Sequence, residues 1–264
     1  MIRIFHDFRI DTETMNPLRI RDVELGADLP KICVPVTGRD EAEILSQMDT
    51  IRRMPFDLIE WRADFFTGMY DSSSCAHILA LFRENFKNTP LLFTIRTANE
   101  GGEADIATGV YEDLIRETAR TGLADLVDVE LSRGDDVLKR IVADARDHGC
   151  RVIASCHNFS STPSKESLVN TLCRMQDLGA DIAKYAVMPQ SDRDVLTLLD
   201  ASLTMKESHR DTPVITMSMG PQGAVSRICG KLSGSCLTFG TAGAASAPGQ
   251  IPADTLKEFL EILG

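Results

Sequence analysis

Short apolar runs alternate with longer amphipathic segments along most of the chain, and this alternation limits the possible folds most strongly. The apolar runs predict strands over residues 31–36, 58–62, 91–96, 125–130, 151–157, 181–187, 213–217 and 235–239. The segments between them have helical periodicity, and Ser191 stands at capping-box spacing before Asp194. Eight strands, each followed by a helix, predict an α/β fold whose parallel sheet closes into a (β/α)8 TIM barrel.

An open, doubly wound sheet is the alternative to the barrel. That fold normally has a glycine-rich turn after its first strand, and none follows Val36. The first thirty residues do not fit the repeat, because residues 2–10 and 18–25 alternate in polarity around Asn16-Pro17. We expect an antiparallel hairpin that closes the bottom of the barrel. Residues 1–264 would then form one domain, with residues 1–30 as an N-terminal extension.

Composition excludes several classes of protein. The 28 Lys and Arg against 39 Asp and Glu give a net charge of −11, which disfavours binding to nucleic acid. No stretch reaches the roughly 20 apolar residues of a membrane span, and the N-terminus lacks the apolar core of a signal peptide. The seven cysteines are scattered and form no CxxC pair, so we expect reduced thiols in a cytoplasmic protein.

Charged side chains recur on one face of consecutive strands. Because side chains alternate along a strand, the face that lines the barrel would carry Glu60, Arg62, Arg96, Asp128, Glu130, His157 and Lys184. One such residue alone would usually form a salt bridge at the rim. Their gathering on five strands, mostly near the carboxyl ends where barrel enzymes have their active sites, predicts a catalytic site.

Lys184 indicates the chemistry of that site, because it lies in the middle of an otherwise apolar strand. A buried lysine that is partly neutral attacks carbonyl groups and forms an imine, which acidifies the neighbouring C–H bond. His157, on the next strand, is the natural base to remove that proton. Glu60 would accept hydrogen bonds from substrate hydroxyls, and an anionic substrate would be bound by the guanidinium groups of Arg62, Arg96 and Arg227. These residues predict a Schiff-base enzyme acting on a hydroxylated keto acid.

Two other kinds of site find little support. Asp128 and Glu130 with His157 form a weak pattern for a metal site, since a single histidine and two carboxylates are spread over two strands. A serine nucleophile on an elbow would need a GxSxG motif, and the chain has none.

From about Lys31 to the C-terminus the sequence resembles the type I 3-dehydroquinate dehydratases. The order and spacing of short motifs carry the resemblance: 60–62 (EWR), 93–96 (FTIR), 100–102 (EGG), 128–131 (DVEL), 155–157 (SCH), 183–186 (AKYA), 188–189 (MP), 217–220 (MSMG), Arg227 and 246–250 (SAPGQ). The resemblance implies a (β/α)8 barrel, usually a homodimer, that dehydrates 3-dehydroquinate to 3-dehydroshikimate without a metal or an organic cofactor.

The resemblance also implies a role for each matching residue. Lys184 would form the imine, and His157 would remove the C2 proton and help to expel the C1 hydroxyl as water. Arg227 would bind the substrate carboxylate, and Glu100 would support the histidine. Glu60, Arg62 and Arg96 would hold the hydroxyls and neighbouring polar groups. Ser246 and Gln250 belong to a glycine-rich segment after the last strand, where a mobile loop over the barrel mouth is expected.

The chain departs from the family pattern at two positions. Asn158 follows the histidine where relatives often carry aspartate, and Pro35 replaces a small hydroxyl residue at the end of the first strand. Met217 and Phe239 would line the pocket. Two other functions remain open: a class I aldolase-like lyase that uses the same imine to cleave a C–C bond, and a barrel that binds sugar acids without catalysis.

Overall fold

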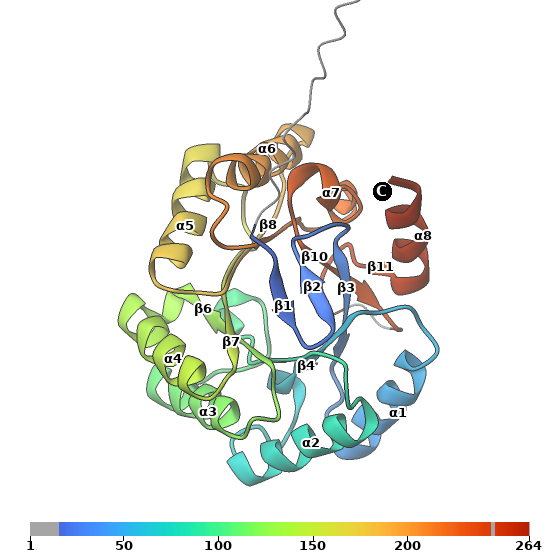
Figure 1. Cartoon of the computed structure of the whole chain (residues 1–264), viewed down its shortest axis with the longest axis vertical. Helices are drawn as coiled ribbons and strands as arrows, with labels where there is room; N and C mark the ends of the chain where they lie inside the picture. Colours follow the sequence, from blue (N-terminus) through green and yellow to red (C-terminus); the bar gives the residue numbers. More distant parts are fainter. Residues whose placement is uncertain (1–15, 244–245, 264) are drawn as a thin grey trace, which may run out of the picture.

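The structure, a computed structural model, describes residues 16–243 and 246–263, in which parallel strands curl into a barrel enclosed by helices (Figure 1). The barrel strands are β3 (Lys31–Val36), β4 (Leu58–Arg62), β5 (Leu91–Thr94), β6 (Leu126–Glu130), β7 (Arg151–Asn158), β8 (Ile182–Val187), β9 (Val214–Ser218) and β10 (Leu237–Thr241). The α-helices are α1 (Glu41–Ile51), α2 (Ser72–Asn85), α3 (Thr108–Arg120), α4 (Asp135–Asp147), α5 (Lys165–Asp177), α6 (Asp192–Ser208), α7 (Gly230–Ser233) and α8 (Ala253–Leu263).

The strands follow one another around the barrel in chain order. Each strand from β3 to β8 pairs in parallel with its successor, and β10 pairs with β3. The remaining gap is closed where the backbone N–H of Cys236 donates to the carbonyl oxygen of Val214 at 2.8 Å. A short strand, β11 (Ile251–Pro252), extends β10. The predicted (β/α)8 barrel is confirmed, and the open doubly wound alternative is wrong.

The ends of the eight barrel strands lie within two residues of the predicted ones. The strand expected over 91–96 ends at Thr94, because the backbone N–H of Arg96 donates to Oδ1 of Asp64 at 3.2 Å. The last strand is displaced by two residues towards the C-terminus. The predicted cap of α6 is present, since Oγ of Ser191 accepts from the backbone N–H of Asp194 at 3.3 Å.

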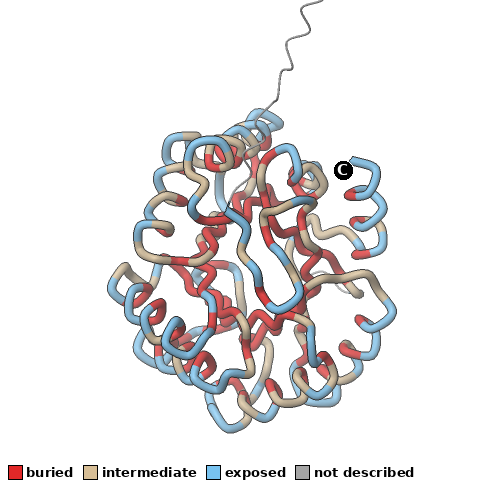
Figure 2. Tube along the Cα trace, in the orientation of Figure 1, coloured by how far each residue is buried: buried red, intermediate tan, exposed pale blue. Residues whose placement is uncertain are grey.

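Two apolar clusters hold the barrel together, and alternation along the strands separates them. Ile59 and Trp61 point outward into the cluster between the sheet and the helices. Leu58 and its counterparts on the other strands fill the lower interior of the barrel: Cys33, Leu92, Leu126, Ile153, Ile182, Ile215 and Leu237. Figure 2 shows these buried segments as the central part of the molecule. The charged residues lie on the same inner face as this second cluster. They stand two or four residues further along each chain segment, towards the carboxyl ends of the strands.

A hairpin closes the bottom of the barrel, but not between the predicted strands. It consists of β1 (Leu18–Ile20) and β2 (Val23–Leu25), so the strand expected over 18–25 is wrong: it turns back at Arg21, whose φ is 53°. Ile20 and Leu25 are buried against the inner cluster, and the hairpin crosses the centre of the barrel in Figure 1. The other expected strand, 2–10, lies outside the described residues.

The structure also bears on the expectations from composition. All seven cysteines are free thiols, as their scattered spacing predicts. Within the described ranges, every helix is too short or too polar to cross a lipid bilayer.

Candidate active site

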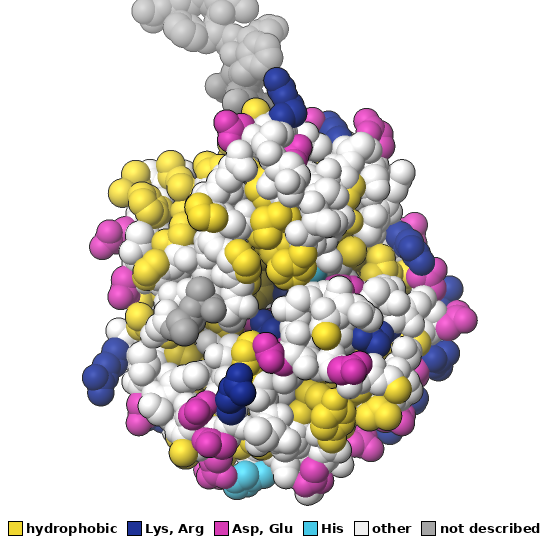
Figure 3. Space-filling model, turned by 180° about the vertical axis from the view of Figure 1, so that it is seen from behind, with side chains coloured by type: hydrophobic (Ala, Val, Ile, Leu, Met, Phe, Trp, Pro, Cys, Tyr) yellow, Lys and Arg dark blue, Asp and Glu magenta, His cyan; other side chains and the backbone are white. Residues whose placement is uncertain are grey.

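A pocket of about 520 Å³ opens at the carboxyl ends of the strands, at the end of the barrel opposite the hairpin. In Figure 3, which views the molecule from behind, basic side chains lie at the bottom of a hollow with an apolar upper rim. All nine residues predicted for the site line this pocket: Glu60, Arg62, Arg96, Glu100, His157, Lys184, Arg227, Ser246 and Gln250. Met217 and Phe239 also line it, as expected. The remaining lining residues are Gly101, Ala186, Met219 and Ala247, which belong to the quoted motifs, and Phe159, which the sequence did not indicate.

Lys184 points from β8 into the barrel, and only 4% of its surface is exposed. Its Nζ lies 3.1 Å from Oδ2 of Asp128 and 3.9 Å from Oε1 of Glu60. The ring of Phe239 lies 4.6 Å from the same nitrogen, at a distance typical of a cation–π contact. The amine is therefore held between carboxylates and an aromatic face at the bottom of the pocket.

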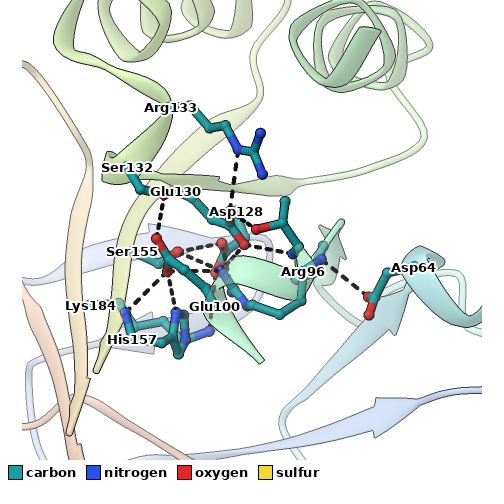
Figure 4. A network of polar contacts seen from close by, with 12 residues as sticks. Asp64, Arg96, Glu100, Asp128, Glu130, Ser132, Arg133, Ser155, His157 and Lys184 are labelled. Atoms are coloured by element: carbon teal, nitrogen blue, oxygen red, sulfur yellow. Dashed lines mark hydrogen bonds and ion pairs between the residues drawn. The ribbon is translucent and has the colours of Figure 1, made fainter. Parts of the chain in front are cut away.

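A network of buried charges lies beside the lysine (Figure 4). Arg96 is at its centre, with Nη2 2.8 Å from Oδ1 of Asp128 and Nη1 3.0 Å from Oε1 of Glu130. The hydroxyl of Ser155 donates to Oδ1 of Asp128 at 2.6 Å. Burial alone would raise the pKa of Asp128, but the charges of Arg96 and Lys184 outweigh it and hold that pKa well below its usual range.

This network explains the carboxylates that resembled metal ligands in the sequence. Glu130 accepts from the backbone N–H of Thr97 at 2.8 Å and from its hydroxyl at 2.6 Å, in addition to its ion pair with Arg96. No group of three potential ligand side chains suited to a metal ion occurs among the described residues. Arg96 is the positive partner of Asp128 and Glu130 in the structure.

His157 is oriented by Glu100. Its Nδ1 lies 2.9 Å from Oε2 of Glu100, and its backbone N–H donates to the same oxygen at 3.1 Å. Burial, and then the charges of Arg96 and Lys184, lower the pKa of His157 well below its usual value. Burial, followed by the charge of Glu130, raises the pKa of Glu100 to about 7. The contact through Nδ1 leaves Nε2 of a neutral imidazole available to a bound molecule.

Two glycines allow Glu100 to approach the histidine. Glu100 ends a short 3-10 helix, η2 (Ala98–Glu100), and Gly101 follows with a φ of +79°. At Gly102 a Cβ atom would lie 2.1 Å from the carbonyl oxygen of Arg96, so a larger residue would push the loop outward. The Glu-Gly-Gly sequence therefore folds back over the end of β5 and places the carboxylate against β7.

Arg62 and Glu60, on β4, have partners of their own. Nε and Nη2 of Arg62 each donate to a carboxylate oxygen of Asp64 at 2.8 Å. Asp64 also accepts from the backbone N–H of Arg96, which fixes the guanidinium relative to the next strand. Oε1 of Glu60 accepts from the hydroxyl of Thr94 at 2.9 Å. Both pocket side chains are thus held in place before any ligand binds.

Arg227 differs from the other arginines of the pocket. It ends the 3-10 helix η4 (Ala224–Arg227) and is 2% exposed, yet no carboxylate among the described residues pairs with it. Its Nη2 donates to the carbonyl oxygen of Pro248 at 3.0 Å, and its Nε has no partner within the described part of the chain. Burial lowers the pKa of Arg227 to about 10. A buried guanidinium of this kind is suited to an anionic ligand.

The loop that contains Pro248 carries the two polar residues predicted to cover the ligand. The backbone N–H of Ser246 donates to Oε1 of Gln250 at 2.8 Å, and Nε2 of Gln250 donates to Oγ of Ser246 at 3.0 Å. These bonds close residues 246–250 into a compact turn beside Arg227.

The comparison with known proteins identifies the family. A family model for type I 3-dehydroquinase matches residues 32–264. The chain belongs to the type I 3-dehydroquinases. Among curated proteins, it is 46% identical to a 3-dehydroquinate dehydratase of Syntrophotalea carbinolica, over 94% of this chain and 98% of that one.

Solved type I 3-dehydroquinases have the same fold. The enzyme of Clostridium difficile, determined with covalently modified comenic acid, is 42% identical and superimposes with a TM-score of 0.91 over 94% of this chain and 98% of that one. The 3-dehydroquinate dehydratase of Geobacillus kaustophilus is 37% identical, with a TM-score of 0.90 over 95% and 97% of the two chains.

The two departures from the usual type I 3-dehydroquinase pattern lie beside the pocket rather than in it. Oδ1 of Asn158 accepts from the backbone N–H of Ser160 and from that of Ser161, each at 3.0 Å, so this side chain caps a turn. Pro35 is in register with Glu60 on the neighbouring strand but lines a separate hollow with Thr37.

The sequence of this type I 3-dehydroquinase does not indicate that Asp128 and Ser155 pair beneath the lysine. Alternation placed both on the inner face with Lys184, so the signal was present. Their pairing could not be read from it, because the two residues are 27 positions apart in the chain and meet only across the ladder between β6 and β7.

Proposed function

We propose that this enzyme dehydrates 3-dehydroquinate to 3-dehydroshikimate and water through an imine on Lys184. The observation that carries the proposal is the combination of groups around one pocket: a buried amine, an oriented imidazole and a buried guanidinium without an anionic partner in the described structure. An amine forms an imine with a ketone, an imidazole moves a proton, and a guanidinium binds a carboxylate. The substrate has all three corresponding features.

The reaction then proceeds in four steps. The neutral amine of Lys184 attacks the C3 ketone, and loss of water gives a protonated imine. His157 removes a proton from C2, and the electrons of that C–H bond form a neutral enamine. The enamine electrons expel the C1 hydroxyl, which takes the proton from His157 and leaves as water. Hydrolysis of the resulting conjugated imine releases 3-dehydroshikimate and restores the amine.

The other pocket residues bind the substrate. Arg227 pairs with its carboxylate, and the loop residues Ser246 and Gln250 cover it. Glu60 accepts hydrogen bonds from hydroxyls, while Arg62 and Arg96 donate to neighbouring oxygens with N–H groups that their acidic partners leave free. Glu100 keeps the imidazole in the orientation and tautomer that proton removal requires.

We further propose that residues 1–264 act as one domain, that the enzyme is a cytoplasmic homodimer in the shikimate pathway, and that it uses no metal or organic cofactor. The free thiols are consistent with a reducing compartment. The imine itself supplies the electron sink that the reaction needs, so the chemistry requires no further group.

Reductive trapping tests the proposal. Borohydride added during turnover of 3-dehydroquinate should leave a stable mass increase on Lys184, located by peptide mass spectrometry. Lys184→Met should abolish both the adduct and turnover. As a matched control, Lys165→Met changes a partly exposed lysine paired with Asp200 and should retain both.

The product distinguishes dehydration from aldol cleavage. Dehydration forms an enone that absorbs in the near ultraviolet, whereas cleavage of a C–C bond would release two carbon fragments. An unmodified Lys184 in an enzyme that turns over would eliminate the imine mechanism, and fragments in place of the enone would favour the aldolase-like alternative.

A further inference from the structure

Asp128 contacts the reacting amine from below the pocket. Its side chain is fully buried and does not line the pocket, whereas Lys184 does. Oδ2 lies 3.1 Å from Nζ of Lys184, and Oδ1 is occupied by Arg96 at 2.8 Å and by the hydroxyl of Ser155 at 2.6 Å. Ligand bound in the pocket would therefore meet Nζ from the other side, and the carboxylate would stay beside the nitrogen throughout the reaction.

We propose that Asp128 is the fixed counterion of the protonated imine on Lys184. This inference rests on the proposed function, because it assigns a partner to an intermediate of that reaction. An adjacent carboxylate favours a cation at this nitrogen over a neutral group, and inside the barrel the attraction is stronger than in water. The imine nitrogen must be protonated to withdraw electrons, so a counterion maintains the reactive form.

The counterion acts most strongly when the hydroxyl leaves. At that step the enamine electrons move to form a C–C double bond, the C–O bond breaks, and the hydroxyl takes a proton from the imidazolium of His157. The nitrogen changes from neutral to positive as the conjugated imine forms. A carboxylate 3.1 Å from that nitrogen is already oriented towards the developing charge, which is how preorganised groups lower barriers.

Asp128 is better suited to this role than the other groups around the nitrogen. Glu60 is more distant, at 3.9 Å, lines the pocket and is available to substrate hydroxyls. Asp128 is unsuited to proton transfer, because Arg96 and Lys184 outweigh the effect of burial and keep its pKa low. Nζ is contacted by Asp128, Glu60 and the ring of Phe239, and its charge also acts on Cys33 and His157. Arg96 and Ser155 bind the other carboxylate oxygen of Asp128. Only Asp128 among them is both anionic and outside the pocket lining.

Cyanoborohydride trapping as a function of pH tests the proposal, since this reagent reduces the protonated imine. In the presence of 3-dehydroquinate, the trapping rate on Lys184 gives the pH at which the imine is half protonated. Asp128→Asn, which removes the charge and keeps the shape, should lower this midpoint by at least about one pH unit and lower kcat about 100-fold. Asp64→Asn is the matched control, because it removes another buried carboxylate that pairs with arginine but does not touch Lys184. Its trapping midpoint should equal that of the wild type.

The wild-type enzyme provides a second measurement that does not depend on folding of the variant. Its imine should retain a proton to a higher pH than the imine of the same ketone with butylamine in water. An unchanged midpoint in folded Asp128→Asn, or a wild-type midpoint no higher than that of butylamine, would overturn the counterion. Absence of any adduct in the wild type would instead refute the proposed imine mechanism, so the two failures are distinguishable.

Discussion

Replacing Arg227 with methionine should stabilise the free enzyme and weaken substrate binding at the same time. Burial lowers the pKa of Arg227 to about 10, and its Nε has no hydrogen-bond partner within the described residues. Relative to the ordinary pKa of an arginine, this lowering corresponds to about 3 kcal/mol of unfavourable free energy for the charged side chain in the folded protein. This unfavourable free energy is present in the free enzyme, and the carboxylate of a bound ligand would offset it.

The expected gain in stability is smaller than that cost. Methionine loses the hydrogen bond from Nη2 to Pro248, which contributes about 1 kcal/mol. Its flexible apolar side chain can fill a buried site of this length. Arg227→Met should therefore raise the free energy of unfolding by about 2 kcal/mol at neutral pH, as measured by urea denaturation without ligand.

Substrate binding should change in the opposite direction. A hydrogen-bonded pair of charges contributes about 1.5–3 kcal/mol, so KM for 3-dehydroquinate should rise roughly 10- to 150-fold. Arg193→Met, an exposed substitution in the first turn of α6, is the control and should leave KM unchanged. A variant that is less stable than the wild type and binds substrate equally well would refute the reasoning.

Two further outcomes concern the imidazole and its partner. His157→Asn should lower kcat by about 10²–10⁴-fold while borohydride still traps an adduct on Lys184, and loss of the adduct would contradict the assigned role. Folding raises the pKa of Glu100 from 4.5 to about 7, because the protonated carboxyl is favoured in the folded protein. The contribution of Glu100 to the free energy of unfolding is therefore fully present below pH 4.5 and is lost as the pH rises to about 7. Urea denaturation of Glu100→Gln should therefore show a stability advantage over wild type that grows by up to about 3 kcal/mol between pH 4.5 and 8; a constant difference would argue against the raised pKa.

The hairpin shows where pattern alone misleads. Apolar residues stand at 18 and 20 and then at 23 and 25, so the alternation changes phase at Arg21-Asp22, and one continuous strand would place Ile20 and Leu25 on opposite faces. Two short strands joined by a turn at this point allow both residues to be buried against the inner apolar cluster. The change of phase is therefore present in the local sequence, whereas the apolar surface that buries the hairpin comes from strands far along the chain.

The sequence by itself determined the barrel and the face on which Lys184, His157, Arg62 and Arg96 lie. Both follow from short periodicities, because each residue along a strand alternates between the interior and the helices. Tertiary structure alone decided that Asp128 sits beneath the amine and that Arg227 is buried without an acidic partner in the described structure. These pairings depend on the distances between side chains on different strands. Because electrostatic interactions weaken with distance and strengthen with burial, the pairings form only once the barrel has closed.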